Sequence, residues 1–320
     1  MGFEDAMSDY HDLLARPDID VVSVCTPAAS HAGIVLDAIR ASKHVLCEKP
    51  ITTTKEDARA IASAASEQPD LCISCVFQHR DDPALQRARW LLEEEALGRV
   101  LAVHLSARAC RDAAYYGDTR GRMETDGGGA LMVQGIHLLD ALIWLVGPVA
   151  SVSATMDTFV HTIDTEDMIG GWARLVTGTV ATIDCTTCAQ RDVYSIDVLG
   201  ETAGLRLGYR PGWARTWSLG VKSKSRQSGW KMRWRAERRF PPDSRFRAGS
   251  VAKLAVGRLI GDDRVASHLG HGPHVRRFLE AIEIGGPPPV SPADAARALE
   301  TVLAFYQSAN QGEPIHISPS

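Results

Sequence analysis

The chain begins with a regular alternation of apolar runs and amphipathic segments. Three runs are apolar almost throughout and predict strands: residues 19–27, 43–50 and 71–80. Three segments carry apolar side chains at helical spacing and predict helices: residues 30–42, 54–68 and 82–98. Buried strands that alternate with helices are typical of parallel βαβ units covered on both faces. The pattern therefore predicts an α/β fold that begins with a doubly wound parallel sheet.

Polar residues and prolines mark where these helices start. Ser30 precedes the first helix, Thr53 or Thr54 the second, and Asp82 with Pro83 the third. These residue types accept hydrogen bonds from the free N–H groups of a first turn, or begin a helix without needing one. The sequence therefore predicts capped helices between the strands.

The pattern changes near residue 100. Five later stretches alternate apolar and polar residues: 100–108, 149–159, 167–176, 178–189 and 194–207. Such alternation predicts a large, mostly antiparallel sheet with one open face. A long apolar helix at 130–147 follows three glycines, and a final helix covers about 291–311. We expect two domains, residues 1–98 and 99–320, with the final helix packing back on the first.

Composition and charge narrow the class of protein. The 320 residues are 45% hydrophobic and 23% charged, as in a globular protein of two domains. The net charge of -4 predicts no attraction to nucleic acid or anionic membranes. We identify no apolar run of the roughly 18–20 residues that a membrane span needs. Residues 1–14 lack the pattern of a signal peptide, so we expect a cytoplasmic protein.

The seven cysteines raise the question of a metal site. They are odd in number and scattered, so a disulfide framework is not expected. Two CxxC pairs, Cys72/Cys75 and Cys185/Cys188, suit either a zinc site or small core residues. Both pairs lie in β-branched stretches without the turn that a zinc knuckle needs. We therefore favour core packing and expect no metal.

Residues 222–247 form a strongly basic segment. It contains ten Lys and Arg but only two acidic residues, Glu237 and Asp243, which gives a formal charge of 10 − 2 = +8. Trp230 and Trp234 lie among the basic residues. A nucleic-acid surface would combine such features. We favour a solvated loop and keep a handle for an anionic substrate as the alternative.

The three predicted strands of the first sheet all end in polar or special residues. These are Thr26-Pro27, Glu48-Lys49-Pro50 and Gln78-His79-Arg80. Ligands of open parallel sheets bind outside the carboxyl ends of the strands. The agreement of the three ends predicts a ligand site there.

Lys49 is the first candidate for chemistry at this edge. The residue before a proline is kept out of the helical region, so Lys49 should extend from its strand, and the Lys49–Pro50 bond is a candidate for the cis form. Partial burial would lower the lysine pKa towards the range of a proton-transfer group, with Glu48 as a tuning neighbour. The plainer alternative is a surface lysine.

His137, on the long apolar helix, is the second candidate. The glycines before the helix permit close backbone approach, and Asp140 follows His137 at i+3, where it could orient the ring. Together, Lys49 and His137 could take a proton from an alcohol while hydride leaves its carbon. The alternative for His137 is a satisfied core histidine.

Six segments carry a family resemblance. They are "TPAASH", "CEKP", "FQHR", "ALGRV", "GGGALMVQGIHLLD" and "TEDM". Their order and spacing resemble those of the Gfo/Idh/MocA oxidoreductases over nearly the whole chain. EKP alone is a weak signal, whereas EKP followed by GGGxLxxxGxHxxD at this distance is specific.

The resemblance implies a Rossmann-like nicotinamide-binding domain and an α/β domain whose open sheet makes homo-oligomer contacts, in a dimer or tetramer. It implies reversible NAD(P)-dependent oxidation of a hydroxyl on a sugar, cyclitol or similar polyol. Lys49 and His137 would be catalytic. The implied cofactor-binding residues are Thr26, Pro27, His31, Glu48, Lys49 and Gln78. The candidate substrate-binding residues are Tyr116, Arg122, Gln134 and His137, with Tyr115 and Arg120 nearby.

Two departures from the family pattern stand out. Family members often carry Asp or Asn where this chain has Val133, which cannot bond a hydroxyl or tune Lys49. The glycine-rich phosphate turn and the ribose-reading residue have no counterpart in residues 1–20, as if about two βα units, roughly 60 residues, were absent. We therefore expect weak or absent binding of NAD or NADP by this chain. A catalytically silent binding or assembly protein is the alternative function.

Overall fold

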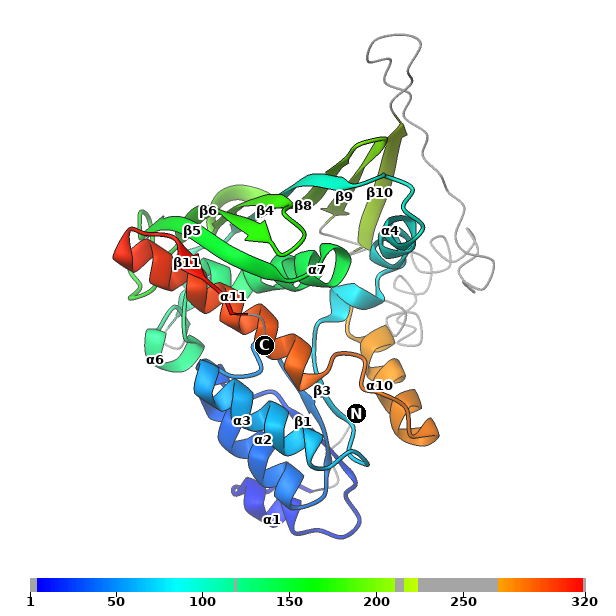
Figure 1. Cartoon of the computed structure of the whole chain (residues 1–320). Helices are drawn as coiled ribbons and strands as arrows, with labels where there is room; N and C mark the ends of the chain where they lie inside the picture. Colours follow the sequence, from blue (N-terminus) through cyan, green and yellow to red (C-terminus); the bar gives the residue numbers. More distant parts are fainter. Residues whose placement is uncertain (1–4, 118–119, 211–215, 224–269, 319–320) are drawn as a thin grey trace, which may run out of the picture.

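The computed structural model describes residues 5–117, 120–210, 216–223 and 270–318 (Figure 1). Almost all of the basic segment 222–247 lies outside these ranges. The described chain forms two sheets with helices between and around them. The predicted fold class is confirmed: a small parallel sheet is followed by a large, mostly antiparallel one.

The small sheet contains the three strands that the apolar runs predict. It is parallel, with the order β1-β2-β3. Its elements, with the neighbouring helices, are α1 (Tyr10–Leu14), β1 (Val21–Val24), η1 (Ala28–Ser30), α2 (His31–Arg40), β2 (His44–Cys47), α3 (Lys55–Ser66), β3 (Ile73–Cys75), η2 (Gln78–Asp81) and α4 (Pro83–Glu93).

The helix starts agree with the predicted caps in two of three cases. Thr54 accepts a hydrogen bond from the Asp57 N–H, and Asp82 accepts one from the Ala84 N–H. Ser30 makes no such bond to α2, because its hydroxyl donates to the Pro27 carbonyl instead.

The large sheet has eight strands in the order β10-β9-β8-β4-β7-β6-β5-β11, and only β4 and β7 pair in parallel. Its strands are β4 (Val100–Cys110), β5 (Val149–Asp157), β6 (Met168–Leu175), β7 (Val180–Thr186), β8 (Cys188–Gly200), β9 (Ala203–Arg210), β10 (Thr216–Ser223) and β11 (Ile315–His316). The remaining helices are α5 (Ala113–Tyr116), α6 (Met123–Asp126), η3 (Leu131–Gly135), α7 (Ile136–Val146), α10 (Gly272–Ile284) and α11 (Pro292–Gln311).

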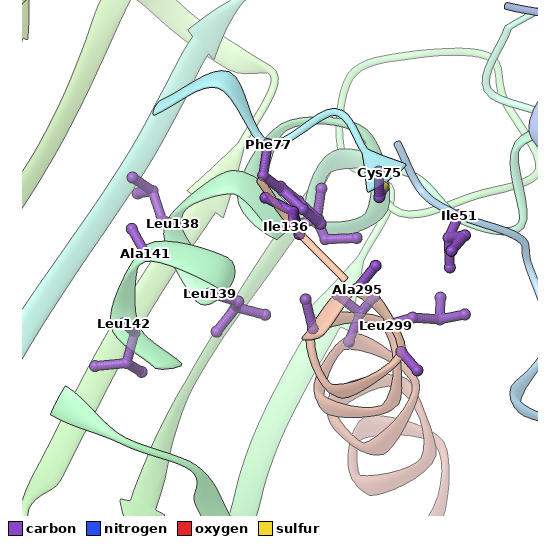
Figure 2. Close-up of a cluster of buried hydrophobic side chains, with 14 of the residues drawn as sticks. Ile51, Cys75, Phe77, Ile136, Leu138, Leu139, Ala141, Leu142, Ala295 and Leu299 are labelled. Atoms are coloured by element: carbon purple, nitrogen blue, oxygen red, sulfur yellow. The ribbon is translucent and has the colours of Figure 1, made fainter. Parts of the chain in front are cut away.

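The helices α7 and α11 pack in the region between the two sheets. Helix α7 packs under the large sheet, and α11 runs between the sheets, against α3 on one side and β5 on the other (Figure 1). Figure 2 shows Phe77, Ile136 and Leu139 facing Ala295 and Leu299 in a common apolar core. The loop after β3 is therefore held against the long apolar helix, which fixes the edge where the site lies.

The expectation that no apolar stretch is long enough for a membrane span is wrong. The helical stretch Met123–Val146 is long and apolar enough to cross a membrane, with a mean hydropathy of 1.7. Sixty-one per cent of its most apolar window is buried inside the molecule, and Leu138 and Leu142 are almost fully buried. This packing is that of a core helix of a globular protein.

Candidate active site

Lys49 reaches from the end of β2 to the long apolar helix. Its Nζ donates a hydrogen bond of 2.6 Å to the backbone carbonyl of Val133, and the Lys49–Pro50 peptide is cis. Burial lowers the pKa of Lys49 below its ordinary 10.5, and the nearby charge of Arg120 adds to this, against Glu48 and Asp126. A lysine with a lowered pKa is suited to proton transfer.

The carbonyl that receives Lys49 belongs to a widened turn. Residues Leu131–Gly135 are π-helical, and α7 follows directly. A Cβ added at Gly135 would lie 2.9 Å from the Cys185 Sγ, so only glycine lets this turn rest on β7. Single π-helical turns are frequent at functional sites, because they redirect backbone groups from the regular helix. Here the backbone carbonyl of Val133 accepts the Lys49 hydrogen bond that the apolar Val133 side chain cannot accept.

The last of the three glycines before this turn, Gly129, fits against Glu166. A Cβ at Gly129 would lie 1.9 Å from the Glu166 carbonyl oxygen. The Glu166 carboxylate accepts 2.8 Å hydrogen bonds from the N–H groups of Gly129 and Leu131, and a 2.9 Å bond from the Tyr306 hydroxyl. Glu166 therefore caps the helix that carries His137. Glu166 and Tyr306 are not among the residues predicted for the site, although "TEDM" and the three glycines are the sequence signals of this packing.

Burial governs the protonation of His137. Its Nδ1 is buried and has no hydrogen-bond partner within the described ranges. The ring meets the Phe77 ring edge-on at 6.0 Å and the His79 ring at 4.9 Å between centroids. Burial lowers the pKa of His137 well below 6.5, and the charge on Lys49 lowers it further. The imidazole is thus neutral at neutral pH and near enough to Lys49 to interact with it.

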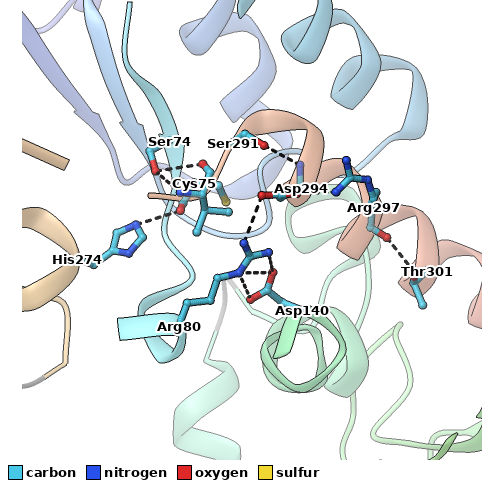
Figure 3. Close-up of polar contacts among 10 residues, drawn as sticks. Ser74, Cys75, Arg80, Asp140, His274, Ser291, Asp294, Arg297 and Thr301 are labelled. Atoms are coloured by element: carbon cyan, nitrogen blue, oxygen red, sulfur yellow. Dashed lines mark hydrogen bonds and ion pairs between the residues drawn. The ribbon is translucent and has the colours of Figure 1, made fainter. Parts of the chain in front are cut away.

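The prediction that Asp140 orients His137 is wrong. Asp140 instead receives the Arg80 guanidinium, with an Arg80 Nη2–Asp140 Oδ1 distance of 2.6 Å, and both side chains are buried (Figure 3). Arg80 also reaches Asp294 at the start of α11, at 3.3 Å. The sequence places Asp140 one turn after His137, but a buried arginine competes for the carboxylate more strongly than a neutral ring does. Arg80, on η2, therefore links α7 through Asp140 and α11 through Asp294.

A small pocket lies beside the turn that holds Lys49. Two of the predicted substrate-binding residues line it, Tyr116 and Gln134, together with Tyr115, Arg120, Val133 and Thr187. Arg122 is exposed and does not line this pocket.

The Gln134 amide is held in place by two tyrosines. Its Nε2 donates to the Tyr115 hydroxyl at 3.2 Å, and its Oε1 accepts from the Tyr194 hydroxyl at 3.1 Å. One N–H and one lone pair of the amide are left for a substrate hydroxyl.

The predicted cofactor residues lie at the carboxyl ends of the three parallel strands. The His31 ring bridges the loops after β1 and β2, with 2.8 Å contacts to the carbonyls of Thr26 and Pro50. Pro27, in the first of these loops, is exposed. In the loop after β3, the Gln78 Oε1 is buried and lacks a partner in the described chain. Such an acceptor fits the amide group of a nicotinamide, so the residues at this edge suit the cofactor.

The Glu48 side chain contacts a residue from the C-terminal part of the chain. Its Oε1 lies 3.4 Å from the His271 Nε2, just before α10. Burial raises the Glu48 pKa, but the His271 contact and the Lys49 backbone N–H outweigh it, so the net pKa is lowered. Glu48 is therefore ionised beside Lys49.

The CxxC cysteines sit in the core of the two sheets. Cys72, Cys75 and Cys185 are buried free thiols, and burial raises their pKa. Cys188 lies near His161 and Asp167, with ligand-type atoms within 4.8 Å of one another. The Asp167 carboxylate is already occupied, because it accepts backbone N–H bonds from residues 159, 160 and 161.

Comparisons with known proteins agree with this fold. Residues 1–75 match the model of an oxidoreductase family with an NAD-binding Rossmann fold, and residues 85–206 match the GFO/IDH/MocA C-terminal domain. The chain therefore belongs to the Gfo/Idh/MocA oxidoreductases.

Three relatives illustrate the similarity. The levoglucosan dehydrogenase of Pseudarthrobacter phenanthrenivorans is 32% identical over 50% of this chain and 41% of its own length. The D-glucoside 3-dehydrogenase of Escherichia coli is 34% identical over 53% and 49%, respectively. Each match thus spans less than half of the curated relative. The WlbA dehydrogenase of Bordetella pertussis, solved with NADH and UDP-GlcNAcA, superimposes with a TM-score of 0.79 at 26% identity, covering 98% of this chain and 84% of that one.

Proposed function

We propose that this chain is an NAD(P)-dependent dehydrogenase that oxidises a secondary hydroxyl of a sugar, cyclitol or similar polyol. The observation that carries the proposal is the meeting of Lys49 with the glycine-led helix of His137. Lys49 follows strand β2 of the small sheet and His137 lies on helix α7, and each has a pKa shifted towards its neutral form. Both family matches and the dehydrogenase relatives support the same reaction class.

The residues of this site have separate roles in the proposed oxidation. A bound nicotinamide cofactor supplies the hydride acceptor. The neutral Lys49 amine takes the proton of the reacting hydroxyl, and the Val133 carbonyl holds the Nζ in place. His137 binds the same oxygen through its neutral ring and helps to orient it. Thr26, Pro27, His31, Glu48 and Gln78 would hold the nicotinamide end of the cofactor.

A substrate screen tests this function. The chain is mixed with NAD+ or NADP+ and a panel of sugars and cyclitols, and the absorbance of reduced nicotinamide is followed. Turnover of any polyol supports the proposal. Tight binding of a sugar without turnover under every condition would favour the silent binding protein instead. A fluorescence titration with NADH and NADPH measures cofactor affinity, for which weak binding stays a prediction.

The open face of the large sheet supports self-association. Met168 and Trp172 lie on the face of β6 opposite to the buried Ile169, and both are exposed, at 40% and 38%. Exposed apolar side chains on one sheet face are typical of an interface. We propose a homo-oligomer through this face. Light scattering of Trp172→Glu should show a smaller particle than wild type, whereas an unchanged mass would reject this interface. A cytoplasmic location stays a prediction.

A further inference from the structure

The pocket beside Val133 contains an arginine without a carboxylate partner. Arg120 lines this pocket and is exposed, and it forms no ion pair in the part of the chain that the structure describes. The one acidic residue lining the same pocket is Asp126, whose Oδ2 accepts the Gly121 N–H at 2.8 Å. Arg120 can therefore reach a ligand without first breaking a salt bridge.

A second guanidinium lies over the same aromatic ring as Arg120. The Arg120 and Arg111 guanidinium carbons lie 4.6 Å and 5.0 Å from the centre of the Tyr115 ring. Arg111 pairs with Asp192 at 3.2 Å, but its Nε is buried and lacks a partner in the described ranges. The exposed Arg120 and the partly buried Arg111 therefore share Tyr115 as an aromatic neighbour.

Lys49 adjoins this pocket through Val133. Its Nζ binds the Val133 carbonyl, and Val133 lines the pocket. Among the described residues, Asp192 pairs with Arg111 and Asp126 accepts the Gly121 N–H, so no carboxylate there pairs with Arg120. An anionic ligand would compensate the Arg120 charge.

We propose that the substrate of this site carries a carboxylate, as a sugar acid does, and that Arg120 binds this group. This inference rests on the proposed function and names its substrate class. A guanidinium matches a carboxylate with two parallel hydrogen bonds. The Tyr115 ring offers an apolar face to the sugar ring, and the fixed Gln134 amide binds a hydroxyl next to the reacting one.

Matched sugar pairs test the proposal. We compare kcat/KM for glucose with glucuronate, for galactose with galacturonate, and for a hexose phosphate. Wild type should prefer the acids at least about 10-fold, and Arg120→Gln should cut this preference by about 10- to 100-fold, the usual effect of losing a charged hydrogen bond. Arg40→Gln is the matched control, because Arg40 is exposed on α2 outside the pocket; it should leave the preference unchanged.

A binding measurement separates this inference from the proposed function. Saturation-transfer NMR detects a bound sugar acid without turnover, and Arg120→Gln should abolish its signal. If no sugar is oxidised but this pattern of binding is seen, the proposed function fails and the carboxylate site stands. Equal use of neutral and acidic sugars, better use of the hexose phosphate, or the same preference in Arg120→Gln and Arg40→Gln would overturn the carboxylate site.

Discussion

The Lys49 Nζ donates a hydrogen bond of 2.6 Å to the backbone carbonyl of Val133. A side chain at position 133 that could bond Lys49 is absent, and the π-helical turn presents a carbonyl in its place. A carbonyl only accepts, so it fixes the position of the Nζ without adding a formal charge. Lys49 therefore keeps the lowered pKa that burial gives it.

The glycine-led turn should be intolerant of even one methyl group. Gly129→Ala places a Cβ against the Glu166 backbone, which has to move and carries the helix start with it. We expect a loss of about 2 kcal/mol or more in unfolding free energy, together with lower activity. Urea denaturation measures the first effect.

Gly33→Ala is the matched control for this substitution. Gly33 lies in α2 with nothing within 4 Å of an added Cβ, so the change should be neutral or stabilising, by up to about 1 kcal/mol. Equal effects of the two substitutions would contradict the packing of Gly129 on Glu166.

The rate should depend on pH through Lys49. The pKa of Lys49 is lowered from 10.5, and the neutral amine is the active form. As the pH rises through the lowered pKa, kcat/KM should therefore increase and level off below pH 10.5. A pH profile of kcat/KM measures this, with protein stability checked at each pH. A rate that rises only above pH 10.5 would show that Lys49 is not perturbed in this way.

The buried ion pair Arg80–Asp140 should matter more for stability than any exposed pair. Asp140→Asn leaves the Arg80 charge buried with only the 3.3 Å contact to Asp294, at an expected cost of about 3–5 kcal/mol. Glu93→Gln, which breaks the exposed i,i+4 pair with Arg89, should cost no more than about 0.5 kcal/mol. Chemical denaturation measures the free energy of unfolding of both variants. Similar losses in the two would contradict the stabilising role of the Arg80–Asp140 pair.

Acid should destabilise the fold through two partly buried histidines, His79 and His137. Burial, with the charges of His271 and Lys49, lowers the pKa of His79 from 6.5 to about 4. Between these values the unfolded chain binds the proton and the folded chain does not. Stability is therefore complete above pH 6.5 and falls as the pH drops towards 4, by at most about 3 kcal/mol for this residue.

Replacing His79 tests this acid sensitivity. In His79→Gln, the difference in Tm between pH 7 and pH 4.5 should be smaller than in wild type, whereas the exposed His104→Gln should keep the wild-type difference. His137 still contributes, so a part of the difference remains. No change in His79→Gln would contradict the assignment.

Periodicity was enough to predict the main elements. The apolar runs ending at Pro27, Pro50 and Arg80 contain β1, β2 and β3, and the alternation after residue 100 became the large sheet. These patterns are local, because each residue's burial follows from its own place in a strand or helix. The helix expected at 130–147 split into a π-helical turn and α7, since hydropathy does not report which carbonyl accepts which N–H.

The partners of buried polar groups were beyond sequence reasoning. Asp140 was paired with His137 because they are three residues apart, yet its partner Arg80 is 60 residues away. Glu166 meets Tyr306 across 140 residues. Such contacts depend on how α7 and α11 pack together, which no local pattern encodes. Only the run of glycines pointed to a close neighbour, without naming it.

The central claim is that Lys49 transfers the proton in an NAD(P)-dependent oxidation. The most direct test compares initial rates of cofactor reduction by wild type and Lys49→Met, with the best polyol from the screen. The account predicts that kcat falls by roughly 10²–10⁴-fold. Bound sugar in both proteins, seen by saturation-transfer NMR, would show that the pocket is intact. An unchanged kcat in Lys49→Met would contradict the account.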